Sequence, residues 1–145
     1  MKDLAHLEAD TVVASYAPGH VERRFLCGQC HVLALVLNRR SGLRLHGLFD
    51  TTDGAMHHAF VVDDETGLAW DIRGGRRPER IHEGSCVTKP RVAQVSEIQV
   101  VEAFGRADRD EVQAARHAAE RYILPTILLS RIPAEPEVTG PELCP

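Results

Sequence analysis

The sequence predicts a single α+β domain, and three observations lead to that prediction. A dense apolar run follows Gly28 and predicts a buried helix over 29–40. Two short apolar segments, 58–62 and 68–72, are separated by turn-forming residues and predict a β-hairpin. The chain has 145 residues, which is enough for one domain with a buried core and short for two.

Turn and breaker residues delimit the elements before the hairpin. Residues 1–20 predict a helix or an irregular cap that ends at Pro18. The helix over 29–40 is followed by polar and basic residues and then Gly42, which is typical of a helix C-terminus. Residues 43–49 alternate enough to predict a strand.

The second half of the chain is less regular. Residues 73–92 are rich in Arg, Gly and Pro and predict a long loop with short pieces of structure. Residues 96–104 predict another strand. Residues 108–123 carry an apolar stripe at helical spacing, and Pro125 is expected to kink or stop that helix. We expect one domain over 1–132 and a loose proline-rich tail over 133–145.

Composition and charge narrow the possible functions. Apolar residues make up 43% of the chain and charged residues 26%, values ordinary for a globular domain. A net charge of -4 argues against a general nucleic-acid binder. No apolar run approaches the roughly 18–20 residues of a membrane span. The first residues lack the pattern of a secretory signal, so we expect a cytoplasmic protein, with secretion by a non-classical route left open.

Cys30 is the strongest candidate nucleophile in the chain. It lies at the expected N-terminus of the buried helix, directly after Gly28 and Gln29. A helix N-terminus presents unpaired N–H groups and the positive end of the helix dipole, and both favour the thiolate over the thiol. The same N–H groups can stabilise the oxyanion that forms when a thiolate attacks a carbonyl.

A cysteine nucleophile needs a base, and the base needs an orienting partner. His58 and Asp71 lie on the two arms of the predicted hairpin. If the turn is the four residues 63–66, these two residues are directly opposed. Opposed residues share a face of the sheet, with Cβ atoms about 4.5–5.5 Å apart. We therefore expect a triad of Cys30, His58 and Asp71.

Three short motifs together resemble papain-like cysteine hydrolases. Residues 28–30 (Gly-Gln-Cys) resemble the start of the nucleophile helix, 58–61 (His-Ala-Phe-Val) the histidine strand, and 71–74 (Asp-Ile-Arg-Gly) the acid strand. The order Cys, His, Asp is similar to that of cell-wall endopeptidases, transglutaminase-like enzymes and bacterial papain-fold glutamine-deamidase toxins. The resemblance implies a nucleophile helix packed on an antiparallel sheet and acyl transfer through a thioester, without a cofactor.

The expected reaction makes the chain a cysteine-dependent amidohydrolase or acyltransferase acting on a glutamine side chain or a peptide bond. Gly28, Gln29 and Arg73 are the candidates for oxyanion or substrate contacts. The basic residues from Arg73 to Arg80 also form a candidate surface for an acidic substrate or partner. The sequence does not choose among deamidation, proteolysis and acyl transfer.

The sequence leaves two other functional classes open, a redox protein and a zinc-stabilised protein. Cys27 and Cys30 form the motif Cys-Gly-Gln-Cys, which can also be interpreted as the redox pair of a thiol–disulfide oxidoreductase of thioredoxin type. The same pair could form half of a structural zinc site with one of the adjacent histidines and Cys86. His57 competes with His58 for the catalytic role, because a one-residue shift in register would exchange their faces.

Overall fold

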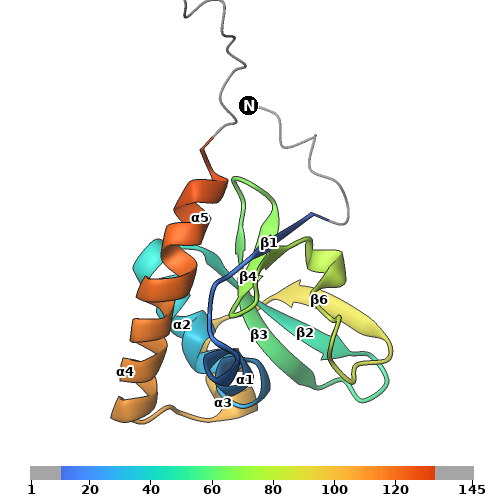
Figure 1. The fold of residues 1–145 in the computed structure, drawn as a ribbon. Coiled ribbons are helices and arrows are strands. Elements are labelled where there is room, and N and C mark those ends of the chain that lie inside the picture. Colours follow the sequence, from blue (N-terminus) through green and yellow to red (C-terminus); the bar gives the residue numbers. More distant parts are fainter. Residues whose placement is uncertain (1–10, 133–145) are drawn as a thin grey trace, which may run out of the picture.

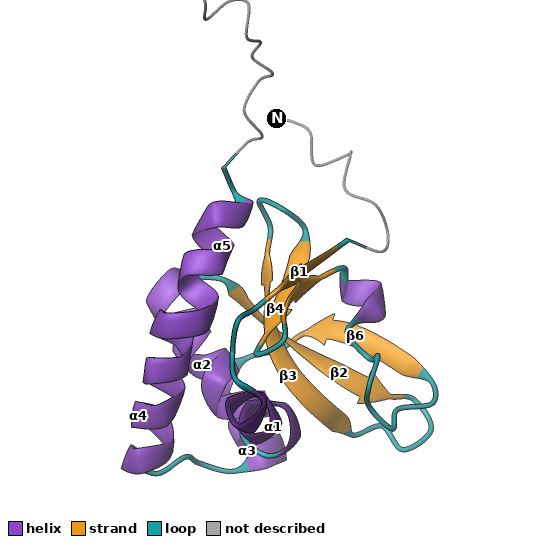
Figure 2. Ribbon diagram, viewed as in Figure 1, coloured by secondary structure: helices purple, strands orange, loops and turns teal. Residues whose placement is uncertain are grey.

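The computed structural model of the chain describes residues 11–132, apart from the side chain of Cys27. These residues form a six-stranded antiparallel sheet with helices packed on one face (Figures 1 and 2). The strand order is β1-β5-β4-β3-β2-β6. The predicted α+β class is confirmed. No helix within the described range is long and apolar enough to cross a bilayer.

The strand order places the hairpin of β3 and β4 at the centre of the sheet. The strands are β1 (Val12–Ala14), β2 (Arg44–Asp50), β3 (Met56–Asp63), β4 (Leu68–Asp71), β5 (Gly74–Arg76) and β6 (Pro90–Gln94). The helices are α1 (Gly19–Cys27), α2 (Cys30–Ser41), the 3-10 turn η2 (Pro78–Arg80), α3 (Glu97–Phe104), α4 (Arg109–Ala118), the π-helical segment η3 (Ala119–Ile123) and α5 (Leu124–Ser130).

The sheet separates two apolar clusters, and the alternation of side chains along the strands explains both. Ala59, Val61 and Trp70 face α2 and belong to the main core. Phe60 and Val62 point to the other face and form a smaller cluster beneath the η2 segment. Both faces of β3 are therefore covered, which is why its sequence is almost continuously apolar.

The predicted strand over 96–104 is wrong, because these residues form α3. Ser96 caps the helix: its hydroxyl accepts the Gln99 N–H at 3.1 Å. The Gln99 side chain accepts the Ser96 N–H at 2.8 Å in return. This reciprocal capping box satisfies two N–H groups that the helix leaves free, and it favours a helix over an extended segment.

The N-terminal prediction also differs from the structure. Pro18 marks the start of a helix, α1, and not the end of one. Residues 12–14 form β1, which pairs with β5. Residues 1–10 of the predicted cap and the predicted tail over 133–145 lie outside the described residues.

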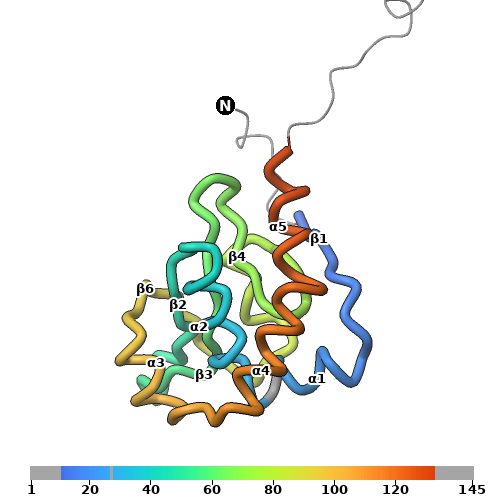
Figure 3. Tube along the Cα trace, turned by 90° about the vertical axis from the view of Figure 1, so that its left-hand side faces the viewer, coloured from blue at the N-terminus to red at the C-terminus, as the bar shows by residue number. Residues whose placement is uncertain are grey.

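The C-terminal helices form one continuous rod, which is visible in Figure 3. The expected helix over 108–123 corresponds to α4 and η3, and the chain then continues directly into α5. Pro125 does not stop the rod, because it lies in the first turn of α5, where a missing N–H costs little. The π-helical turn lies immediately before it, consistent with a local change of hydrogen bonding at a proline.

Candidate active site

Cys30 is the first residue of α2, and its side chain is only 6% exposed. Gln29 precedes it as the N-cap residue, and the backbone carbonyl of Gln29 accepts the N–H groups of Val32 and Leu33. The N–H of Cys30 lies in the first turn, where the helix itself supplies no acceptor. The thiol is therefore placed at the positive end of the α2 dipole.

The hairpin brings His58 and Asp71 together, although not by the expected register. Val61 pairs with Trp70 and Val62 with Ala69, so the four-residue turn spans 64–67. This register places Asp71 beside Phe60 and leaves His58 two positions further along the same face. The diagonal is short enough for contact, and His58 Nε2 lies 2.8 Å from Asp71 Oδ2.

The end of β4 explains how a helix on one face of the sheet reaches a histidine on the other. β4 pairs with β3 only along residues 61–63 and turns away after Asp71. Beyond that point, β3 has no β4 neighbour on this side. The thiol of Cys30 interacts with groups on this part of β3, the backbone of Ala59 and the side chain of His58.

The surroundings of Cys30 favour its thiolate. Burial raises the pKa of the Cys30 thiol, but four interactions outweigh it. The imidazoles of His31 and His58 stabilise the negative charge on the sulfur, His58 adds a favourable charge, and the Ala59 backbone stabilises the thiolate further. Together they lower the pKa of Cys30 to about 6. A thiolate near neutral pH is the reactive form of cysteine.

His58 and Asp71 are charged in opposite senses and stabilise each other. Burial lowers the pKa of His58, but the hydrogen bond and charge of Asp71, together with Cys30, raise it to about 9. Burial raises the pKa of Asp71, but His58 and then Arg73 hold it well below its usual range. Since Nε2 of His58 is bonded to Asp71, Nδ1 is the nitrogen that remains for the thiol.

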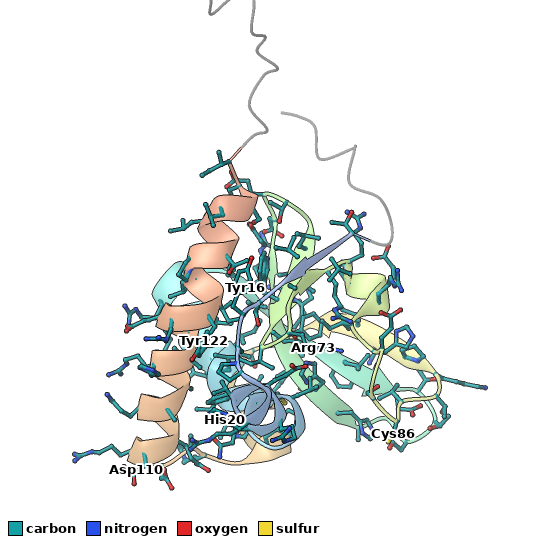
Figure 4. All side chains as sticks on the ribbon, viewed as in Figure 1. Tyr16, His20, Arg73, Cys86, Asp110 and Tyr122 are labelled. Carbon is teal, nitrogen blue, oxygen red and sulfur yellow. The ribbon has the colours of Figure 1, made fainter. Side chains whose placement is uncertain are left out.

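Arg73 lies behind the acid, and its guanidinium is turned toward the protein. Its Nε lies 3.2 Å from both carboxylate oxygens of Asp71, and its Nη2 lies 2.7 Å from Oδ2. Its side chain is 10% exposed. Figure 4 shows Arg73 among the strands, while Cys86 and Asp110 lie at the periphery. The structure thus places Arg73 beside the pair formed by His58 and Asp71, which is called the dyad below. The sequence instead predicts oxyanion or substrate contacts for Arg73.

The other predicted contact residues lie beside Cys30. Gly28 is an exposed residue between α1 and α2. The side chain of Gln29 is held by Arg24, whose Nε donates to Gln29 Oε1 at 3.2 Å. With its oxygen occupied, the Gln29 side chain can offer its NH₂ group to a substrate.

The basic loop expected to meet an acidic partner is largely paired within itself. Arg76 and Arg80 both form ion pairs with Glu83, at 3.4 and 2.7 Å. Together with the inward-turned Arg73, this arrangement leaves less free positive charge on the loop than its sequence indicates.

The two adjacent histidines occupy different environments. His57 is partly exposed, and its Nε2 lies 2.9 Å from Asp53 Oδ2. His58 is buried with Asp71. The structure therefore brings His58, and not His57, together with Cys30.

Sequence reasoning missed the role of His31. Its ring is buried, stacks on Phe104 with ring centroids 5.0 Å apart, and helps to lower the pKa of the Cys30 thiol. Its position directly after the cysteine was a signal, but a helix residue at that point usually only packs. Contact with Phe104 depends on α3, which the sequence analysis had assigned as a strand.

A hollow of about 420 Å³ lies on the face of the sheet that carries His58. The strand register explains why the hollow lies near His58: His58 pairs with Leu48 on β2, and Leu48 pairs with Val92 on β6. The hollow is lined by Leu48, Pro78, Glu79, His82, Pro90 and Val92. Four of these six residues are apolar, and Glu79 and His82 are polar.

The alternative sites have less structural support among the described residues. Within 11–132, no group of three or more His, Cys, Asp or Glu side chains is arranged to hold a metal ion. The side chain of Cys27, which both alternatives require, is outside the described part of the chain. In comparisons with known proteins, no family model, no curated protein and no solved structure matches this chain.

Proposed function

We propose that this chain is a cysteine-dependent amidohydrolase or acyltransferase of papain-like type, acting on a glutamine side chain or a peptide bond. One observation carries the proposal. A thiol at a helix N-terminus, a buried histidine and a buried acid form a continuous chain of interactions from Cys30 through His58 to Asp71. Such a chain is the arrangement that activates a nucleophile for acyl transfer.

In the first step, the Cys30 thiolate attacks the carbonyl carbon of the amide, and the carbonyl oxygen becomes an oxyanion. The Cys30 N–H and the NH₂ group of Gln29 are the donors available to it. Protonated His58 donates its proton to the leaving nitrogen, and the C–N bond breaks. The products are a thioester on Cys30 and free ammonia or an amine.

In the second step, neutral His58 removes a proton from water or from an acceptor amine, which attacks the thioester. The C–S bond then breaks, and the electron pair returns to sulfur as the thiolate. Asp71 stabilises the imidazolium that forms in each cycle, because its carboxylate stays ionised. Water as the acceptor gives hydrolysis or deamidation, and an amine gives acyl transfer.

The test is the rate of iodoacetamide alkylation of each cysteine as a function of pH, followed by mass spectrometry. We expect Cys30 to react with an apparent pKa of about 6, well below the reference value of about 8.5. Cys86 is exposed and serves as an internal reference. Replacing His58 with Ala should raise the apparent pKa of Cys30.

His57→Ala is the matched control, because it removes the neighbouring imidazole without touching Asp71. It should leave the alkylation profile of Cys30 unchanged. The proposal fails if Cys30 titrates like Cys86, or if the two histidine variants behave alike. With an activated thiol established, ammonia release from glutamine-containing peptides would separate deamidation from peptide cleavage.

A further inference from the structure

Arg73 uses its guanidinium to connect three parts of the protein at one point. Besides the Asp71 carboxylate, its Nη2 donates to the carbonyl of Ile81 at 3.0 Å and its Nη1 donates to the carbonyl of Glu83. The Arg73 backbone N–H also donates to Asp71 Oδ1 at 2.9 Å. A planar fork with several rigidly placed donors suits this task, and a lysine ammonium does not reproduce it.

The contacts of Asp71 leave little freedom for its carboxylate. Oδ2 accepts from His58 Nε2 and from Arg73 Nη2, and Oδ1 accepts from the Arg73 backbone. Asp71 is 3% exposed, so solvent offers no competing partner. Removing Arg73 would leave His58 as the one charged side chain among the described residues that hydrogen-bonds to the carboxylate, with Arg76 acting on it through charge alone.

We propose that Arg73 is a positioning residue: it holds the Asp71 carboxylate in the orientation that aims His58 at Cys30. It therefore does not bind substrate. A catalytic role for Arg73 rests on the proposed function. The contacts of Arg73 with Asp71, and of Asp71 with His58, are present whether or not the reaction occurs. Because Arg73 also binds Ile81 and Glu83, the dyad is tied to the segment that lines the hollow beside it.

The first test compares wild-type protein with Arg73→Ala and Arg73→Lys by the pH dependence of Cys30 alkylation. In Arg73→Ala, we expect the apparent pKa of Cys30 to rise by at least about one unit, which lowers the rate below pH 6 about tenfold. Arg73→Lys should give an intermediate value, because an ammonium keeps the charge but loses the fork. If Arg73→Ala does not fold, the test is the difference in the apparent pKa of Cys30 between Arg73→Lys and wild type.

The choice of alkylating agent separates positioning from substrate binding. Iodoacetamide is neutral and iodoacetate is an anion. A positioning residue should affect both rates equally, whereas a substrate-binding arginine would affect iodoacetate selectively. Arg44→Ala is the matched control, since it removes an exposed cation that pairs with Asp64 and leaves the contacts of Arg73 in place; it should leave both rates unchanged.

A second readout does not depend on cysteine chemistry. The ring nitrogens of His58 can be followed by NMR in protein labelled with ¹⁵N-histidine. We expect the pKa of His58 to fall in Arg73→Ala. An unchanged His58 titration together with an unchanged Cys30 profile would overturn the positioning role, while an activated wild-type Cys30 would keep the proposed function. If wild-type Cys30 has ordinary reactivity but the pKa of His58 falls in Arg73→Ala, the proposed function fails and the positioning role of Arg73 stands.

Discussion

At the scale of single residues, the opposite pKa shifts of Cys30 and His58 set the expected pH range of the proposed reaction. The proposed acylation step needs Cys30 as thiolate and His58 as imidazolium. With pKa values of about 6 and about 9, both conditions hold between these limits. We expect kcat/KM to rise as pH increases through about 6 and to fall as it increases through about 9. A profile with a single rising limb near pH 8.5 would show that the pair is not formed.

The charge and the orientation supplied by Asp71 can be separated by two substitutions. Asp71→Asn keeps an acceptor oxygen but removes the charge that raises the pKa of His58. We expect its alkaline limb to move from about 9 toward the reference value of about 6.5. Asp71→Ala removes the acceptor as well and should also lower the maximal rate, by about 10²–10⁴-fold if orientation is lost. Equal pH profiles for both variants and wild type would contradict this role.

At the scale of elements, the capping box of α3 offers a direct stability test. Ser96→Ala removes the hydroxyl that accepts the Gln99 N–H. We expect it to destabilise the protein by about 0.5–2 kcal/mol, measured by urea denaturation. Ser130→Ala is a suitable control, because that hydroxyl bonds to a carbonyl at the end of α5 and caps no helix N-terminus. Loss of the cap should also loosen the Phe104 ring on which His31 stacks.

The same elements show which parts of the fold a sequence pattern can predict. The buried helix starting at Cys30 and the hairpin were predictable, because each depends on periodicity and turn residues within about twenty positions. The segment 96–104 was not, because its apolar residues fit either period and only the reciprocal Ser96–Gln99 contacts decide for a helix.

The candidate site was predictable in its residues and less so in its geometry. The parity of the hairpin register was enough to place His58 and Asp71 on one face. The diagonal contact, the gap left by β4 and the inward turn of Arg73 depend on where strands end and on residues 81–83. Those are long-range features that no local pattern encodes.

At the scale of the whole molecule, an ion pair between a partly exposed arginine and a buried carboxylate joins the end of the last helix to the turn end of the hairpin. Arg131 follows α5 and binds both carboxylate oxygens of Asp63, at 2.9 and 3.0 Å. Asp63 is 1% exposed. The hydrogen bond and charge of Asp63 raise the pKa of Arg131. The contact joins the end of the helical rod to the end of β3.

Arg131→Ala should therefore destabilise the protein by about 1–3 kcal/mol, because the buried Asp63 carboxylate loses the guanidinium that donates to both of its oxygens. The loss should be visible as a lower urea midpoint. Arg116→Ala, which removes an exposed arginine from the same rod, should change the midpoint little. The alkylation profile of Cys30 should be the same in both, since the pair lies at the opposite end of the hairpin from His58.

The placement of Trp70 has a practical consequence for all of these variants. It is the only tryptophan in the chain, it is 0% exposed, and its ring lies so close to Gly75 that a Cβ there would come within 2.8 Å of it. It precedes Asp71 on the same strand, so its indole points to the opposite face, into the main core. Its fluorescence therefore reports the integrity of the main core. A substitution that alters Cys30 reactivity with unchanged emission has altered chemistry, and one that shifts the emission has altered folding.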